Sequence, residues 1–407
     1  MAFGIALSGL AAAQTDLNVT ANNISNSETT GFKQSTAEFA ELFSVSPQGV
    51  SRTQVGNGVK IAAVTQQYGQ GNINTTGNSL DLALNGQGFF VVKDSGAALY
   101  TRAGSFQQDN QGYVVNSANQ RLQVYPPTAT GGFNTSTLTD LRLVTSTSAP
   151  AATTSAQTVF NLAANASVPT ATTFSPTNSN SYNNATSMTL YDSLGAAHTA
   201  SLYFVKTATP NQWTSQLYID GNSVGTAQTL TYSSGGALTT PANGQVSFGA
   251  YTPATGAAAM NVNFDFSKST QYGDTFGVTS LTQDGYTTGQ LVGINVDSTG
   301  VVQANFTNGK SIPLGQVAIS TFQNPQGLQQ ASDTSWVETF ASGQALHSQA
   351  GSSGVGLIQS GSLEASNVDI TQQLVNMITA QRDFQANAQM ISTENNITQT
   401  IINMRGA

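Results

Sequence analysis

The chain offers few side chains whose chemistry could support catalysis or metal binding. Cysteine is absent, and histidine occurs twice, as His198 and His347, far apart in the sequence. A metal site needs clustered ligands, and histidine-assisted nucleophilic catalysis needs a nucleophile paired with the base. His198 follows the segment from Asp192 to Gly195, whose residue types are typical of a β-turn. The sequence therefore predicts no histidine-based catalytic or metal site.

The carboxylates that could act as acids, bases or ligands are better explained as turn residues. Asp265 and Asp274 flank predicted strands and have no acidic companion motif. The segment from Asp297 to Gly300 resembles the start of a calcium loop but lacks the later glutamate. The Gly-x-Gly triplets at Gly56 and Gly69 precede no predicted helix, which argues against a phosphate-binding loop. We therefore predict no enzyme, no cofactor and no bound metal.

The composition is unusually poor in charge. The chain has 407 residues, of which 8% are charged, and a net charge of −8. Folded proteins usually contain about 25% charged residues, and here Ser, Thr, Asn, Gln, Gly and Ala replace them. No basic patch is available to bind nucleic acid or an anionic membrane, and no apolar run approaches the roughly 20 residues of a membrane span. The length allows two or three domains, and the composition is typical of secreted appendage subunits.

The C-terminal segment 366–407 predicts a long helix. Ser366 followed by Asp369 matches a capping box, in which side-chain oxygens accept hydrogen bonds from free N–H groups at a helix start. Apolar or neutral residues then recur at alternating spacings of four and three, as on a helix face that packs along another helix. This face comprises Ile370, Leu374, Met377, Gln381, Phe384, Ala388 and Ile391, and Ile397, Ile401 and Met404 continue the apolar surface.

The N-terminal segment 1–30 repeats the same pattern. Its face comprises Phe3, Leu7, Leu10, Gln14, Leu17, Ala21 and Ile24. Two matching faces at the chain ends predict a coiled-coil-like pair of long terminal helices. The alternative for this segment is a signal peptide, but its positively charged first part is missing because the first basic residue is Lys33.

The polar side of the C-terminal helix predicts contact with other subunits. It carries mostly amides and hydroxyls, whereas a helix exposed to bulk water usually bears many Glu and Lys residues. Two helices joined only at their far ends bury little area, and ordering costs about 1–2 kcal/mol per residue. We therefore expect the termini to order as neighbouring copies assemble. A tail helix folded onto its own domain is the alternative.

Between the helices the sequence predicts two nested, mainly antiparallel β domains. Leu80, Leu82 and Leu84 alternate with polar residues, and Asn85-Gly86 follows as a turn. Similar runs of β-forming residues and turns continue along the chain. The predicted fold class is thus multidomain α+β. The expected segments are a connecting segment 31–75, an inner β domain 76–144 that resumes at 276–350, an inserted outer β domain 145–275, and a Gly/Ser-rich hinge 351–365.

Three motifs resemble signatures of the axial proteins of the bacterial flagellum, the rod and hook family. The N-terminal motif contains Asn22, Asn23, Asn26, Gly31, Phe32 and Lys33. The second, from Leu80 to Phe90 and on to Phe106, contains Gly86, Gly88, Phe89 and Phe90. The C-terminal motif contains Leu363, Glu364, Ser366, Asn367, Val368 and Asp369. These motifs are shared by rod and hook members.

Other stretches resemble the hook members in particular. The segment 191–195 with His198 and Trp213 is similar to the inserted outer domain of hook subunits. The segments 283–291 and 322–328 resemble the return into the inner domain. The distal rod protein, which is the alternative within the family, generally lacks this large insertion.

The resemblance implies a structural, non-enzymatic subunit that polymerises into a curved tube. This tube would act as a universal joint, transmit torque from rod to filament and enclose the export channel. The implied partners are further copies of the chain, the distal rod, hook cap and hook-filament junction proteins, and the type III export apparatus. The implied location is the extracellular hook, reached without a cleaved signal peptide. Asn/Thr-rich residues 22–30 and the segment 351–361 would be hinges.

Two function classes outside the family are alternatives to this one. A secreted β-rich adhesin would use the outer β region for binding, but it does not explain the matched terminal helices. A secreted hydrolase would need an acid–base constellation that the sequence lacks.

Overall fold

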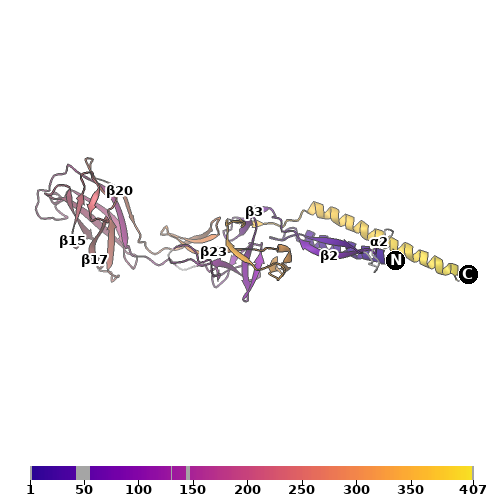
Figure 1. The fold of residues 1–407 in the computed structure, drawn as a ribbon. Coiled ribbons are helices and arrows are strands. Elements are labelled where there is room, and N and C mark those ends of the chain that lie inside the picture. Colours follow the sequence, from indigo (N-terminus) through magenta and orange to yellow (C-terminus); the bar gives the residue numbers. More distant parts are fainter. Residues whose placement is uncertain (1, 43–55, 130, 144–146, 406–407) are drawn as a thin grey trace. The chain divides into compact units, whose positions relative to one another are not determined.

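The structure is a computed structural model that describes residues 2–42, 56–129, 131–143 and 147–405. The chain divides into two compact units (Figure 1). Unit 1 comprises Met1–Thr145, Gly293–Asn305 and Ser311–Ala407, and unit 2 comprises Ser146–Val292 and Phe306–Lys310. Five parts of the expected segments lie outside the described residues: residue 1, 43–55, residue 130, the domain boundary at 144–146, and 406–407.

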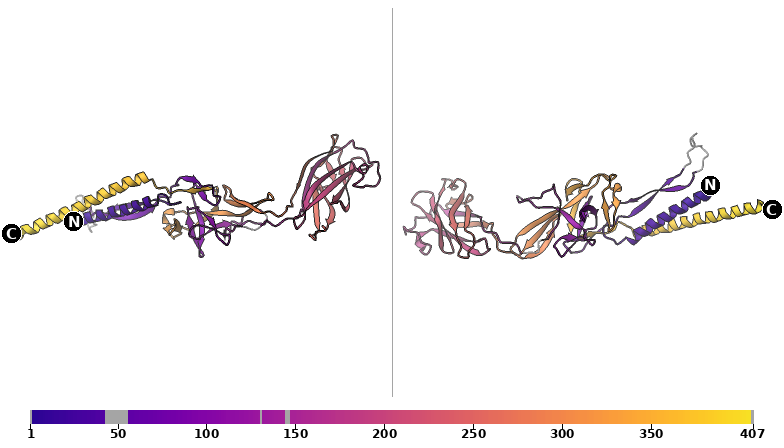
Figure 2. Two further views of the ribbon diagram at one scale, coloured as in Figure 1. Left: turned by 180° about the vertical axis from the view of Figure 1, so that it is seen from behind. Right: turned by 90° about the horizontal axis from the view of Figure 1, so that it is seen from below.

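The described part of unit 1 contains two long α-helices, α1 (Ala2–Ser25) and α2 (Ile370–Arg405). They lie side by side and antiparallel (Figure 2). Asn23 contacts Gln373, and Gly9 lies against Asn387. Residue numbers therefore fall along α1 as they rise along α2, and these two pairs set the register. By this register Ala2 lies opposite residue 394, and α2 continues past the beginning of α1.

The helix α2 begins later than the sequence predicts. Asp369 is its N-cap, because Asp369 Oδ1 accepts hydrogen bonds from the N–H groups of Thr371 (2.9 Å) and Gln372 (3.2 Å). Ser366 Oγ instead accepts from the N–H of Val368 at 3.3 Å. The expected capping box starting at Ser366 is therefore wrong. The residues before the cap stay extended because they are held by the neighbouring strands.

A two-stranded antiparallel hairpin lies beside α1. It consists of β1 (Ser35–Glu41) and β2 (Val59–Gln66). The hydroxyl of Ser8 in α1 accepts a hydrogen bond from the N–H of Val59 at 3.2 Å, which joins the hairpin to the helix. Phe39 and Ile61 remain exposed on this hairpin.

The β region of unit 1 is built on a 12-stranded sheet in the described residues. Its main order is β21-β22-β23-β9-β5-β6-β25-β24, with β7, β8, β10 and β26 paired off this path. The strands are β5 (Phe89–Asp94), β6 (Ala97–Thr101), β7 (Gln107–Gln108), β8 (Val114–Val115), β9 (Arg121–Tyr125), β10 (Thr139–Asp140), β21 (Leu291–Val296), β22 (Val301–Phe306), β23 (Ser311–Thr321), β24 (Gln329–Gln330), β25 (Ser335–Val337) and β26 (Leu346–Gln349). A short 3-10 helix, η2 (Pro325–Gly327), precedes β24.

Side chains of alternate residues in β5 enter different hydrophobic clusters, as expected for strand geometry. Phe90 and Val92 pack with Leu122 and Ile319 in one cluster. Phe89 and Val91 belong to a second cluster that includes Tyr100, Tyr125 and Trp336. Both faces of this central strand are therefore buried.

Two further strand pairs hold the segment before α2. They consist of β27 (Leu357–Ser360) with β4 (Leu82–Asn85), and β28 (Ser362–Glu364) with β3 (Ile73–Thr75). Ile358 is buried, and a Cβ atom at Gly356 would lie 2.5 Å from the carbonyl oxygen of Asn85. The second half of the expected hinge 351–365 is thus paired backbone, and movement there stays a prediction.

Unit 2 contains two five-stranded sheets in its described residues. One has the order β17-β18-β11-β19 with β20 also paired to β11, and the other has the order β12-β13-β14-β15-β16. Their strands are β11 (Ser155–Ala163), β12 (Asn184–Tyr191), β13 (Ala197–Lys206), β14 (Gln212–Ile219), β15 (Asn222–Tyr232), β16 (Leu238–Thr240), β17 (Gln245–Tyr251), β18 (Met260–Asp265), β19 (Thr270–Tyr272) and β20 (Gly277–Gln283), and a 3-10 helix η1 spans Ser179–Ser181.

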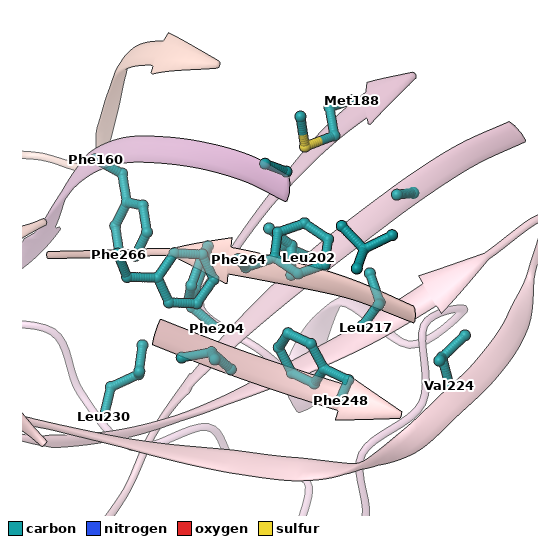
Figure 3. Close-up of a cluster of buried hydrophobic side chains, with 14 of the residues drawn as sticks. Phe160, Met188, Leu202, Phe204, Leu217, Val224, Leu230, Phe248, Phe264 and Phe266 are labelled. Carbon is teal, nitrogen blue, oxygen red and sulfur yellow. The ribbon is translucent and has the colours of Figure 1, made fainter. Parts of the chain in front are cut away.

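A hydrophobic core rich in aromatic residues lies between these strands. Phe160 is 4.5 Å from Phe204 and 5.3 Å from Phe266, measured between ring centroids. Figure 3 shows these rings with Phe264 and Phe248 and the surrounding aliphatic side chains. The strand β13 alternates between more and less exposed positions, as a strand with one face on a core should.

Unit 2 differs from the predicted outer domain at its second edge. The sequence predicts that the inner domain resumes at residue 276, but unit 2 continues to Val292. The reason is that β20 pairs antiparallel with β11, and Phe276 and Val278 pack against the core of unit 2. The sheet is also not wholly antiparallel, because β11 runs parallel to both β18 and β19.

Candidate functional site

The candidate functional site is a junction in unit 1 where the three signature motifs meet. It begins at Gly31, which follows α1 and has a φ of +70°. The N–H of Gly31 donates to the carbonyl of Glu364 at 2.8 Å, and a Cβ atom there would lie 2.4 Å from the backbone nitrogen of Ala103. Because only glycine tolerates both the left-handed backbone and this close approach, the chain can turn here directly into the junction.

A buried ion cluster forms the centre of the junction. Lys33 Nζ is 2.6 Å from Glu364 Oε1, and Arg102 Nη1 is 3.1 Å from Glu364 Oε2. All three side chains are at most 3% exposed. The carboxylate thus contacts a cation through each of its oxygens, and residues that are distant in sequence are joined at one point.

Backbone groups make further hydrogen bonds to this cluster. Lys33 Nζ also donates to the carbonyl of Gly69 at 2.7 Å, and the N–H of Gly71 donates to Glu364 Oε1 at 2.9 Å. Arg102 donates to the carbonyls of Leu84 (3.3 Å) and Gly86 (2.7 Å). Buried charges are tolerated when their partners are complete in this way.

The electrostatics of the cluster are unbalanced, since two cations share one carboxylate. Burial lowers the pKa of Lys33; the Glu364 carboxylate opposes this shift and the Arg102 charge adds to it. Burial likewise lowers the pKa of Arg102, again against the effect of Glu364. Carbonyl oxygens around both cations stabilise the excess positive charge. Both buried cations therefore depend on the carboxylate of Glu364 for a compensating negative charge.

A layer of amide hydrogen bonds connects the cluster to both helices. Asn367 Oδ1 accepts from the N–H of Gln34 at 2.8 Å, and its Nδ2 donates to the carbonyl of Gln67 at 2.7 Å. Asn23, at the end of α1, bonds both backbone groups of Ser35 and donates to Gln373 Oε1 at 3.3 Å. These contacts fix the last turn of α1 and the first turn of α2 to the same strands.

The structure brings some signature residues into the junction and places others beside it. Asn23, Gly31, Lys33, Glu364 and Asn367 make the contacts described above. Phe32, Phe89, Phe90 and Ser366 are buried nearby or in the adjoining cores, Gly86 and Gly88 adopt positive φ, and Leu363 and Val368 are half-buried. Asn22, Asn26 and Asp369 act locally, in hydrogen bonds at the helix ends.

The helix contact differs from the predicted seam. On α1 the buried residues are Ala6, Ala13, Thr20 and Asn23, while Leu10, Leu17 and Ile24 are half-buried and Phe3 and Leu7 are exposed. On α2 they are Gln373 and Ala380, while Met377, Phe384 and Ile391 are half-buried and Ile370, Leu374, Ile397 and Ile401 are exposed. The predicted seam of large residues is therefore only partly buried in one copy, in which Ala6, Ala13 and Ala380 are the fully buried apolar residues of the described helices, and its role in packing and polymerisation stays a prediction.

The histidine and carboxylate side chains that could have supported chemistry serve local structure. Asp297 accepts hydrogen bonds from the N–H groups of Thr299 and Val301, both at 2.9 Å, as expected of a turn residue. His347 Nδ1 lies 2.7 Å from Ser320 Oγ. Within the described residues no group of three or more His, Cys, Asp or Glu side chains is placed to hold a metal. None of the described helices has the length and apolar character needed to cross a bilayer.

The sequence did not single out several residues of the site. Arg102 lies in the second signature motif, which extends to Phe106, but its neighbours in the sequence do not indicate that it is buried. Gln34 and Gln373 hydrogen-bond to each other at 3.2 Å and were not identified. The spacing of Ala6 and Ala13 by seven residues was an available signal for the small-residue face.

Family models match most of the chain. The flagella basal body rod protein model covers residues 3–33, and the flagellar hook protein FlgE/F/G D1 domain model covers 83–173. The flagellar basal body protein FlaE D2 domain model covers 161–286, and the flagellar basal body rod FlgEFG protein C-terminal model covers 359–404. The first and last of these contain the two ends of the junction.

Individual relatives match from end to end. The chain is 40% identical to the flagellar hook protein FlgE of Escherichia coli K12 and 38% identical to that of Salmonella typhimurium LT2, with 100% of each chain covered. It is 31% identical to the flagellar hook protein FlgE of Borreliella burgdorferi over 98% of both chains. The crystal structure of Helicobacter pylori flagellar hook protein FlgE2 shares the fold, with a TM-score of 0.54 at 13% identity over 72% of this chain and 100% of that one. The chain therefore belongs to the structural family of flagellar hook proteins, FlgE.

Proposed function

We propose that the chain is a structural subunit of the flagellar hook whose copies polymerise through their terminal helices into a tube. The observation that carries this proposal is the apolar surface that α1 and α2 leave uncovered in one copy. Among the described residues of these helices, eleven large apolar side chains are at least 45% exposed. They are Phe3, Leu7, Ile370, Leu374, Val375, Ile378, Met390, Ile397, Ile401, Ile402 and Met404.

The end of α2 is the clearest case. Beyond residue 394 the helix has no α1 residue opposite it, and Ile397, Ile401 and Met404 are among its exposed side chains. Full burial of one such side chain stabilises by roughly 1.5–3 kcal/mol. Contiguous exposed apolar surface of this kind usually marks a protein contact. Neighbouring copies that covered it would offset the ordering entropy of the helix.

The family supports a wider role for this polymer. The proposed tube is curved and flexible, transmits torque from rod to filament, and encloses a channel lined by uncharged amide side chains of α2. Its proposed partners are the distal rod, hook cap and hook-filament junction proteins. Each subunit would pass through the type III export apparatus without cleavage of a signal peptide and reach the extracellular hook.

The test compares two double variants of the full chain. Ile397→Ser with Ile401→Ser removes apolar groups from α2, and Val168→Ser with Val292→Ser removes similarly exposed groups from unit 2. We expect the α2 variant to melt like the native monomer by circular dichroism but to form no tubes in electron micrographs. The control should form curved tubes and restore motility to cells that lack their own hook protein.

Normal tubes from the α2 variant would contradict the proposal. Straight tubes from the native chain would instead favour the distal-rod role. A native chain that binds cell surfaces but never polymerises would favour an adhesin.

A further inference from the structure

One end of unit 2 contains a histidine enclosed by two carboxylates. His198, near the start of β13, has Nδ1 2.6 Å from Asp220 Oδ2 and Nε2 3.2 Å from Asp192 Oδ2. The His198 and Asp192 side chains are 7% and 0% exposed, and that of Asp220 is 39% exposed. Asp192 precedes the turn between β12 and β13, and Asp220 lies in the turn between β14 and β15. The imidazole thus connects two turns.

Each carboxylate also holds backbone or side-chain groups of its surroundings. Asp192 Oδ1 accepts from the N–H groups of Leu194 and Ala196, both at 2.9 Å, which fixes the β12–β13 turn. Asp192 Oδ2 accepts from the hydroxyl of Thr255 at 3.1 Å, in the connection between β17 and β18. In the same connection, the N–H of Ala258 donates a hydrogen bond to Ser193 Oγ at 2.9 Å. A third chain segment is therefore tied to the cluster through Asp192.

Asp220 completes the arrangement on the other side of the imidazole. Its Oδ1 accepts from the N–H of Thr199 at 2.9 Å, and its Oδ2 accepts from the Tyr251 hydroxyl at 3.2 Å. The Tyr251 ring, at the end of β17, lies 5.7 Å from the His198 ring between centroids. The titratable groups that face His198 in these contacts are therefore Asp192, Asp220 and Tyr251.

The geometry requires a proton on both ring nitrogens. A neutral imidazole has one N–H group and could donate to only one of the two carboxylates, whereas imidazolium donates to both. After proton loss, one nitrogen lone pair would face a carboxylate oxygen at hydrogen-bond distance. The contacts at one of the two turns would then become repulsive.

The titration of the groups agrees with this geometry. Burial alone would lower the His198 pKa, but the hydrogen bonds and charges of Asp220 and Asp192 outweigh it, and the pKa is raised. Despite burial, hydrogen bonds from Ala196 and His198 lower the Asp192 pKa, and those from His198 and Thr199 lower the Asp220 pKa. Burial and the Asp220 charge raise the pKa of Tyr251, so its hydroxyl stays protonated between pH 6 and 9.

We propose that His198 is a proton-dependent clamp. As imidazolium it holds the β12–β13 turn, the β14–β15 turn and the β17–β18 connection together, and it releases them when the ring loses its proton. The stabilisation is complete below about pH 6.5, the unperturbed value for histidine, and declines as the pH rises through the raised pKa. This inference concerns unit 2 alone and does not rest on polymerisation.

The first experiment is an NMR titration of the full chain labelled at histidine. With two histidines in the sequence, the spectrum contains one signal from His198 and one from His347 as an internal reference. Burial lowers the pKa of His347 despite the opposing charge of Glu338. We expect His198 to titrate above 6.5 and His347 below it. A His198 pKa at or below 6.5 would overturn the proposal, and this result needs no variant.

The second experiment measures amide hydrogen exchange of Leu194, Ala196 and Ala258 from pH 6 to pH 9. After correction for the intrinsic pH dependence of exchange, protection should fall by up to about tenfold per pH unit between about pH 6.5 and the His198 pKa, and should level off above that pKa. His198→Gln should remove this pH dependence, and His347→Gln should keep it. An unchanged pH dependence in His198→Gln would show that another group controls the β12–β13 turn and the β17–β18 connection and would overturn the proposal.

Discussion

Replacing Glu364 with glutamine should destabilise unit 1 strongly, because it removes the carboxylate that lies between Lys33 and Arg102. Both cations are at most 3% exposed and would remain buried beside a neutral amide. Removing one partner of a buried ion pair typically costs about 3–5 kcal/mol. For a unit of this size each kcal/mol corresponds to roughly 2–4 °C, so the melting temperature of unit 1 should fall by roughly 6–20 °C.

The two tryptophans allow this loss to be assigned to one unit. Trp336 is buried in unit 1 and Trp213 is buried in unit 2. In a Trp213→Phe background, fluorescence follows the unfolding of unit 1 alone, in heat and in urea. Glu28→Gln, at an exposed carboxylate near the end of α1, is the matched control and should leave the midpoints of thermal and urea unfolding unchanged.

The charge imbalance also predicts which of two substitutions in the cluster destabilises unit 1 more. Lys33→Met leaves the Arg102–Glu364 pair balanced, Glu364 Oε1 keeps its bond from the N–H of Gly71, and the Gly69 carbonyl keeps its bond from Asn367 Nδ2 at 3.1 Å. Lys33→Met should therefore cost less than Glu364→Gln. The reasoning is refuted if Lys33→Met lowers the melting temperature of unit 1 by as much as Glu364→Gln, or if Glu364→Gln matches the Glu28→Gln control.

Two further substitutions test the surroundings of the junction. Burial and repulsion from Asp383 raise the pKa of Asp16, so this side chain destabilises the helix pair at neutral pH and ceases to do so as the pH falls through the raised pKa. Asp16→Asn should raise stability at pH 7 by about 0.5 kcal/mol or less, given solvent screening, and the gain should vanish in acid; urea titrations at both pH values check the sign. Gly31→Ala should cost more than the roughly 1–2 kcal/mol of a left-handed alanine, because its Cβ also meets Ala103. Gly77→Ala, with a φ of +81° and open space around it, should cost about that strain alone, and equal losses in thermal melts would contradict the close-approach argument.

The parts of the fold that follow local rules were predictable. Alternating residues and turn glycines indicated the strands, and periodic apolar residues indicated a helix at each end. The buried face of α1 differs from the one that the apolar repeat predicts: the small residues Ala6 and Ala13 are buried, whereas the large residues Phe3 and Leu7 are exposed. Periodicity identifies a helix, but it does not distinguish a face that meets its own chain from one that meets another.

The junction was only partly accessible from sequence. The motifs that contain Lys33 and Glu364 were recognised, yet nothing local indicates that these residues, 331 positions apart, form an ion pair. Their contact depends on β28 pairing with β3 and on the turn at Gly31, which are long-range features. The start of α2 was misplaced for the same reason: Ser366 satisfies a local capping pattern, but the hydrogen bonds of Asn367 keep the backbone extended until Asp369.

The different packing of the two units supports the proposal that assembly depends on the terminal helices. Unit 2 buries large side chains such as Trp213 and Phe264 completely, so its fold does not require a neighbour. Between α1 and α2 the buried groups are mainly small, and each buried CH₂ contributes only about 0.8 kcal/mol. Amide contacts such as Asn23–Gln373 add about 1 kcal/mol each and set the register of the helices. Long helices depend on tertiary packing for their stability, and here one copy supplies little of it. The junction therefore fixes where α2 begins and how it enters the helix pair, whereas we propose that contacts with other subunits supply the free energy that orders its far end.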